Sequence, residues 1–233
     1  MIWRQTVAKS KKRVTRKALL KEPDEFITFT GRMIKFFREY YTQVTYAAVA
    51  FFIIIFSIAG FRYYTGWKEK KAFTALDQVM TAYNKALDDK SDLTDVKNSF
   101  RKVVDEYAGY AGGNMARVVY ANICYQTNDF DTAVSLYAKA LEDFKDDTLL
   151  RNFIRSSIGY AYEGKKDFKD AERYFNEIAS AKNAVMTDMA LFNLAMLYDD
   201  EGNKEKATEA YKKILSDHPD SLYIEMVKEK LNG

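Results

Sequence analysis

Histidine, cysteine and proline are nearly missing from this sequence. Its 233 residues include 1 histidine, 1 cysteine and 2 prolines. A single histidine cannot support a convincing Ser/His/Asp set, and the sequence has neither metal-ligand spacing nor a glycine-rich loop that cradles phosphate. One cysteine excludes a disulfide within the chain. We therefore predict that the protein is not an enzyme and that it uses no metal or other cofactor.

The few residues capable of chemistry are expected to be structural. His218, in Asp217-His218-Pro219, should close a helix and interact with its negative end. Cys124 falls at a core position and should be an inert buried thiol. The acidic pairs at 146–147 and 199–200 are typical of turns or solvated helix faces.

The scarcity of proline and glycine favours long helices. The sequence has only 10 glycines, whereas a strand-rich fold needs many turns that use both residue types. Its 48% hydrophobic and 15% aromatic content is ample for a packed core. We predict an all-α protein.

Positive charge is concentrated at the start of the chain. Residues 1–39 hold 11 Lys or Arg against 4 Asp or Glu, a net charge of +7, whereas the whole chain carries +3. From Tyr40 to Phe61 there follow 22 residues without a charge. As a helix they extend roughly 33 Å at 1.5 Å per residue, enough to cross a hydrocarbon core of about 30 Å. We predict three regions: a basic cytoplasmic segment (1–39), a transmembrane helix (40–64) and a repeat domain (65–233).

Aromatic and basic residues flank this span. Tyr40, Tyr41 and Tyr46 lie at one end and Tyr63, Tyr64 and Trp67 at the other, as expected at the headgroup level. The basic residues before the span predict a cytoplasmic N-terminus. Four basic residues, Arg62, Lys68, Lys70 and Lys71, also follow the span. The basic residues before the span are Arg4, Lys9, Lys11, Lys12, Arg13, Arg16, Lys17, Lys21, Arg32, Lys35 and Arg38. The alternatives are a buried core helix and a signal peptide cleaved near Ser57-Ile58-Ala59.

The residues just before the span predict an amphipathic helix. Its apolar side chains recur at helical spacing, and Pro23, Asp24 and Glu25 suit a helix start; the apolar positions are Phe26, Phe29, Met33, Phe36 or Phe37, and Tyr40. This helix either lies on anionic lipid or a membrane partner, or serves only as a basic topology signal. Nucleic-acid binding is not expected, because the basic stretch lacks interleaved aromatics.

Beyond Trp67 the sequence repeats itself. The landmark alanines Ala133, Ala171 and Ala207 are 38 and 36 residues apart, and each lies in a segment with a small residue before it and an aromatic after it. Small residues let two antiparallel helices approach, and aromatics fill the gap to the next pair. The preceding small residues are Ala121, Gly159 and Ala195, and the following aromatics are Tyr137, Phe175 and Tyr211.

On these residues the chain resembles the tetratricopeptide repeat family. The match is best in two units, through Gly159, Tyr162, Ala171 and Phe175 and through Ala195, Tyr198, Ala207, Tyr211 and Pro219. The unit around Ala133 departs from the pattern at Cys124 and Lys145. A fourth, weaker unit uses Met80, Tyr83, Leu87, Val96, Phe100 and Val103, with Asn84 where a small residue belongs. A C-terminal capping helix is expected from Tyr223, Val227 and Leu231.

The resemblance also implies a partner-binding groove along the first helix of each pair. The groove positions are Met115, Val118, Asn122, Tyr125, Phe153, Ser156, Tyr160, Glu163, Met189, Phe192, Met196 and Asp199. Aromatic and methionine side chains there suit an apolar or extended peptide, although some could instead pack against neighbouring helices. These positions carry no Lys or Arg, so capture of a C-terminal carboxylate is not expected.

The order of parts is similar to that of the bacterial ancillary SecYEG translocon subunit family. That resemblance implies an inner-membrane protein with a periplasmic repeat domain, which passes exported chains to periplasmic chaperones near the translocon. Two alternatives remain: an assembly factor for an envelope or cell-division machine, and a regulatory anchor that acts through its basic cytoplasmic N-terminus.

Overall fold

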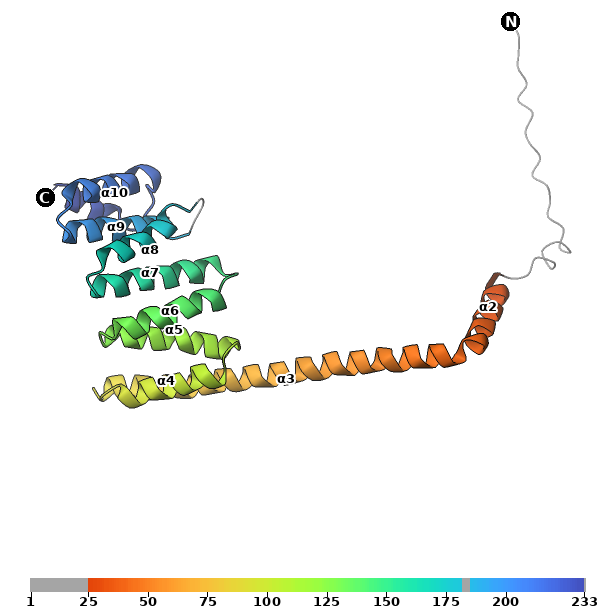
Figure 1. The fold of residues 1–233 in the computed structure, drawn as a ribbon. Coiled ribbons are helices and arrows are strands. Elements are labelled where there is room, and N and C mark those ends of the chain that lie inside the picture. Colours follow the sequence, from red (N-terminus) through yellow and green to blue (C-terminus); the bar gives the residue numbers. More distant parts are fainter. Residues whose placement is uncertain (1–24, 182–184, 233) are drawn as a thin grey trace, which may run out of the picture. The chain divides into compact units, whose positions relative to one another are not determined.

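The computed structural model describes residues 25–181 and 185–232 (Figure 1). The basic residues from Arg4 to Lys21, with Pro23 and Asp24, lie outside the described residues. The described residues form ten helices and no strand, which confirms the all-α prediction for this part of the chain. The helices are α2 (Glu25–Glu39), α3 (Tyr41–Asp88), α4 (Thr94–Glu106), α5 (Ala111–Gln126), α6 (Phe130–Asp143), α7 (Thr148–Gly164), α8 (Phe168–Ala179), α9 (Thr187–Asp200), α10 (Lys204–Asp217) and α11 (Ile224–Asn232).

The chain divides into two units, Met1–Tyr63 and Tyr64–Gly233. The first contains α2 and the apolar beginning of α3. Every side chain from residue 45 to residue 64 is exposed. Among the described residues, α3 is the one helix long and apolar enough to cross a membrane, and its apolar window contains no buried residue. A core helix would be buried, so this observation argues against the soluble-core alternative.

The second unit is a stack of antiparallel helix pairs (Figure 1). The end of α3 pairs with α4, where the rings of Tyr83 and Phe100 meet edge to face with centroids 6.3 Å apart. The pairs α5–α6, α7–α8 and α9–α10 follow. Val96, Phe100 and Val103 are all buried on α4, so the weaker unit is a genuine fourth pair.

The landmark residues lie in the core as predicted. Ala133 and Ala171 are fully buried and Ala207 is 1% exposed. A Cβ atom added to Gly159 would lie 2.5 Å from the ring of Phe175, which explains why a small residue stands opposite the aromatic. The alternation of small and large side chains thus determines how closely the two helices of a pair approach.

The turn inside each pair has the same backbone conformation. Lys90, Asn128, Lys166 and Gly202 all adopt positive φ, between 52° and 76°. Successive members of this series are 38, 38 and 36 residues apart. In each turn the N–H of the residue after the positive-φ residue donates a hydrogen bond to the carbonyl five residues earlier, in the preceding helix. Examples are Ser91 to Ala86 and Asp129 to Cys124, both at 2.8 Å. This recurring Schellman turn marks four units independently of their side chains.

The first helix pair, α3–α4, differs from the others in the length of its turn. Six positions separate Lys90 from the first buried residue of α4, Val96, whereas five separate Asn128 from Ala133. The turn also corrects the register expected for Asn84, which is exposed. Ala121, the small residue of the α5–α6 pair, lies seven positions before the turn residue Asn128. Tyr83 lies seven positions before the turn residue Lys90, so Tyr83, and not Asn84, occupies the small-residue position of the α3–α4 pair.

Polar side chains and a final helix close the ends of the stack. Asp147 accepts a hydrogen bond from the N–H of Leu150 at 2.9 Å and so caps α7; the acidic pair at 146–147 therefore begins a helix. His218 ends α10, with its N–H donating to the carbonyl of Ile214 at 3.0 Å. The predicted cap is α11, whose Val227 is fully buried.

Candidate partner-binding groove

The twelve predicted groove positions lie on α5, α7 and α9, the first helices of three successive pairs. Three of them expose large side chains to solvent: Met115 is 41%, Tyr125 36% and Phe153 45% exposed. Met115 and Phe153 occupy equivalent places near the starts of α5 and α7. Large apolar side chains that remain open to solvent on successive helices suit contact with another protein.

Two of the predicted positions are closed by packing. Val118 is 7% exposed and Ser156 is 2% exposed. The repeat register places both on the groove side, but neighbouring helices cover them. In this structure neither side chain presents a surface to a partner.

The middle of the groove is held by contacts between helices. The hydroxyl of Tyr137 on α6 donates to Oδ1 of Asn122 on α5. Tyr160 on α7 donates to Oδ1 of Asn193 on α9 at 2.9 Å, and its ring meets that of Phe175 with centroids 5.4 Å apart. Asn122 and Tyr160 are therefore half-buried structural contacts as well as groove residues.

The C-terminal end of the groove is hollow. A cavity of about 860 Å³ lies between α9, α10 and α11 and is lined by Phe192, Met196 and Asp199 among others. The ring of Phe192 stacks on Tyr223, with centroids 4.6 Å apart and planes 18° apart. Met189, one helical turn earlier on α9, is half-buried. A partner would meet apolar side chains here together with charged ones, because Lys204, Glu229 and Lys230 also line the cavity.

Acidic groups gather near the ends of α7 and α9. Burial raises the pKa of Glu163, and the like charge of Asp200 raises it further. Asp199 accepts hydrogen bonds from Lys204 at 2.8 Å and from Tyr211 at 3.1 Å. The bond from Lys204 is the main cause of the lowered pKa of Asp199. The charge of Asp199 is thus compensated within the chain, whereas the charged group that acts on Glu163 has the same sign.

Two exposed apolar residues were not predicted from the sequence. Leu149 is 55% exposed and lies with Phe153 on a hollow of about 440 Å³ at the start of α7. It precedes Phe153 by four residues, so extending the groove face back by one turn would have found it. Met226, 44% exposed, lines the cavity beside Phe192. It belongs to the capping helix, which the repeat register does not cover.

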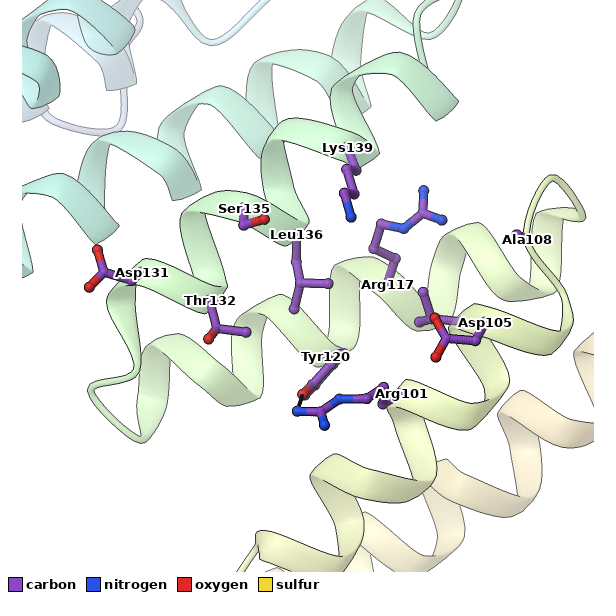
Figure 2. Close-up of a pocket in the computed structure, with 11 residues that line it drawn as sticks. Arg101, Asp105, Ala108, Arg117, Tyr120, Asp131, Thr132, Ser135, Leu136 and Lys139 are labelled. Atoms are coloured by element: carbon purple, nitrogen blue, oxygen red, sulfur yellow. Dashed lines mark hydrogen bonds between the residues drawn. The ribbon is translucent and has the colours of Figure 1, made fainter.

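Another hollow, of about 610 Å³, lies between α4, α5 and α6 (Figure 2). Figure 2 shows Arg101, Arg117 and Lys139 among its lining residues. Arg101 donates to the hydroxyl of Tyr120 at 3.1 Å, and Arg117 forms an ion pair with Asp143. Carboxylates also line it, so the hollow does not select for one sign of charge.

The residues of possible chemical interest are structural where the structure describes them. Cys124 is fully buried, and burial raises the pKa of its thiol to about 11. Such a thiol stays protonated and is a poor nucleophile at neutral pH. Residues 25–181 and 185–232 contain no group of three or more His, Cys, Asp or Glu placed to hold a metal ion.

Comparison with known proteins gives matches along much of the chain. Residues 35–155 match the family model described as a tetratricopeptide repeat-like domain, and residues 189–221 match a tetratricopeptide repeat. The crystal structure of BtubC (BKLC) from P. vanneervenii is 13% identical, over 67% of this chain and 74% of that chain, with a TM-score of 0.48. The structure of MamA AMB-1 is 18% identical, over 70% and 97% of the two chains, with a TM-score of 0.38. No curated protein matches the sequence.

Proposed function

The chain belongs to the tetratricopeptide repeat-like domain family, and on that premise we propose that it is a membrane-anchored scaffold that assists protein export. In this proposal the groove on α5, α7 and α9 binds translocon components, periplasmic chaperones or exported chains. The protein performs no catalysis and requires no cofactor. Tetratricopeptide repeats generally serve to bind other proteins, which is the broader function that the family match supports.

The exposure of Phe153 is the observation that carries the binding role. Nearly half of its surface remains open although the adjacent Asn152 and Ile154 are buried. Complete burial of a large apolar side chain contributes roughly 1.5–3 kcal/mol of stability, and the exposed part of Phe153 forgoes a share of that contribution. Together with Leu149 and Met115, it forms an apolar set that contact with a partner would remove from water.

The anchoring role is supported by the beginning of α3. Its apolar residues are exposed throughout, and water is an unfavourable environment for Phe51, Ile53 and Phe56 together. The match to the family model begins at residue 35, before this stretch, and continues into α7. We place the N-terminus in the bacterial cytoplasm and the repeats in the periplasm, because basic residues concentrate before the span.

A reporter fusion tests this topology. A reporter that is active only in the cytoplasm, fused after Gly233, should be silent, while the same reporter fused before Met1 should be active. Activity at the C-terminal fusion would remove the periplasmic assignment and the translocon role that depends on it.

In situ crosslinking tests the export role. A photo-crosslinking amino acid at Phe153 or Tyr125 should capture translocon subunits, periplasmic chaperones or chains in export. The control position is Lys102, exposed on α4 outside the groove. Capture of cell-division or other envelope machinery alone would favour the assembly role instead. Equal capture from Lys102 would show that the groove is not the binding surface.

A further inference from the structure

The helix α2 presents an exposed apolar face. Phe29 is 62%, Phe36 52% and Phe37 46% exposed, and Met33 and Tyr40 are each 41% exposed. Their positions advance by four, three, one and three residues, which places them on one side of a helix. The ring of Phe36 lies 5.0 Å from that of Tyr40 and 6.1 Å from that of Phe37, so three aromatic rings cluster at the C-terminal part of this face.

Three basic residues lie on the other sides of α2, and Ile34, 67% exposed, borders the apolar face. Arg32, Lys35 and Arg38 fall outside the apolar face, and Glu39 is the one acidic residue between positions 29 and 40. A helix with an aromatic face and a cationic remainder has the composition of segments that lie in the interface of a bilayer. Long basic side chains can reach lipid phosphates while their methylene groups remain near apolar surface.

Chain connectivity restricts what can cover this face. Only Tyr40 separates the end of α2 from the start of α3. The N–H of Tyr40 donates to the carbonyl of Phe36, and the N–H of Val44 donates to the carbonyl of Tyr40, both at 2.9 Å. The two helices are therefore joined without a flexible linker. If α3 crosses a bilayer from about Tyr41, the last turn of α2 must lie at the surface of that bilayer.

We propose that α2 is an interfacial helix that binds anionic lipid, with Phe29, Met33 and Phe36 toward the acyl chains and its basic residues at the headgroup phosphates. The inference rests on the span proposed above and adds a lipid-binding site to it. Anionic lipid is favoured over a partner helix for two reasons. The flanking charges match it, and the tether places the bilayer within reach whether or not another protein is present.

The test uses the full chain in vesicles with a single environment-sensitive fluorophore. Cys124→Ala removes the native thiol, and the label is attached to Met33→Cys on the apolar face or to Lys35→Cys on the basic side. Vesicles contain phosphatidylcholine alone or phosphatidylcholine with phosphatidylglycerol. With phosphatidylglycerol, the Met33 label should emit at shorter wavelength, and an aqueous quencher should act on it on the order of threefold less efficiently than on the Lys35 label.

Charge variants identify the lipid dependence. Arg32→Gln, Lys35→Gln and Arg38→Gln together, with the label at Met33→Cys, should abolish the difference between the two vesicle types. Lys102→Gln, Lys139→Gln and Lys212→Gln make the same change in net charge on the repeats and should leave that difference intact. Equal quenching of the Met33 and Lys35 labels would overturn the proposal. Shielding of the Met33 label that is the same with and without phosphatidylglycerol would also overturn it. Shielding that increases with the number of chains per vesicle would assign the face to a second copy and would also overturn it.

A third label separates this inference from the span itself. A fluorophore at Phe52→Cys, in the middle of the apolar stretch, should be shielded in both vesicle types. Loss of shielding at Phe52 would remove the span and the proposal together. Shielding at Phe52 without shielding at Met33 would leave the anchor in place and refute the interfacial helix alone.

Discussion

Glu69 of α3 caps the start of α5 at Gly112. The carboxylate accepts hydrogen bonds from the backbone N–H groups of Ala111 and Gly112, each at 3.1 Å. A negative group at a helix start satisfies free N–H donors and interacts favourably with the helix dipole. In the same place Gly112 lies against the backbone of Ala72, which is fully buried. The first repeat is therefore joined to the second by a charged cap and a glycine contact.

Gly112→Ala should destabilise the repeat domain. Alanine is the better helix former by about 1 kcal/mol. However, its Cβ would lie 2.6 Å from the carbonyl carbon of Ala72 and from the nitrogen of Phe73, and backbone atoms cannot rotate away. Overpacking of this kind costs roughly 1–3 kcal/mol, so we expect the clash to win.

Thermal unfolding of the full chain in detergent, followed by circular dichroism, measures the effect. Gly66→Ala is the control: Gly66 lies on α3, the helix that Gly112 contacts, and a Cβ there meets nothing within 4 Å. The melting temperature should fall for Gly112→Ala and stay or rise for Gly66→Ala. A rise for both would mean that α5 can move away from α3 at little cost.

The left-handed turns predict a pair of opposite substitutions. Lys166 holds a φ of 61° and Gly202 a φ of 76° at equivalent places in successive units. Lys166→Gly should stabilise the protein and Gly202→Ala should destabilise it, each by about 1 kcal/mol, because a Cβ is disfavoured in this conformation. A Cβ at Gly202 meets nothing within 4 Å, so backbone strain alone is tested there. Chemical denaturation of both variants should give shifts of opposite sign; shifts of the same sign would contradict the shared geometry.

These turns also show how far the sequence could lead. The burial of Ala133, Ala171 and Ala207 was predictable, because small residues at repeat spacing mark close helix contacts. The turn at Lys166 was not predictable, since lysine does not signal positive φ as glycine does. The first unit was misaligned at Asn84 for a related reason. Its turn is one residue longer, and no glycine or asparagine marks the left-handed position at Lys90.

The groove shows a different limit. The repeat register predicts which side of a helix a residue occupies, but not how closely the next helix approaches. Val118 and Ser156, at equivalent places on α5 and α7, are buried for that reason, whereas Phe153, three residues before Ser156 on the same predicted groove face, is open. The pairing of Tyr160 with Asn193 depends on the spacing of α7 and α9, which no short motif encodes.

Cys124 should be unreactive in the folded protein. Its side chain is fully buried, and burial raises the thiol pKa from 9.0 to about 11. The folded state therefore favours the neutral thiol. The contribution of the buried Cys124 thiol to the free energy of unfolding is therefore fully present below the pKa of the unfolded chain. That contribution is lost as pH rises from about 9 through about 11.

Reaction with an aromatic disulfide reagent checks this near neutral pH. Native protein should react far more slowly than denaturant-unfolded protein. The control carries Ser135→Cys, exposed on α6, in a Cys124→Ala background, and should react at once. If native Cys124 reacts as fast as the residue 135 thiol, the first helices of the repeats are not packed as described.

The capping helix α11 should contribute to stability through Val227 and not through the adjacent Met226. Val227 is fully buried, whereas Met226 beside it is 44% exposed. Val227→Ala should lower the free energy of unfolding by roughly 1–3 kcal/mol through lost burial and a cavity. Met226→Ala should change it by about 0.5 kcal/mol or less. Denaturant unfolding of the two variants measures the difference; equal effects would show that α11 is not docked on the last repeat.

The last prediction separates binding from folding within the repeats. Ala171→Leu or Ala207→Leu overpacks a closed helix contact and should cost roughly 1–3 kcal/mol of stability. Phe153→Ala with Met115→Ala removes side chains that are 45% and 41% exposed, so the melting temperature should change little. Crosslinking from Tyr125 should nevertheless fall, because exposed aromatic and methionine side chains are strong candidates for the binding hot spot.

Tyr160→Ala with Phe192→Ala provides the comparison inside the groove. Tyr160 is bonded to Asn193 and Phe192 is stacked on Tyr223, so this pair should lower both stability and capture. Measuring thermal unfolding and crosslinking yield for all these variants distinguishes the surfaces. The groove assignment fails if Phe153→Ala with Met115→Ala leaves capture by the folded protein unchanged. In that case the exposed side chains on α5 and α7 would not contact the partner, and binding would have to use another face.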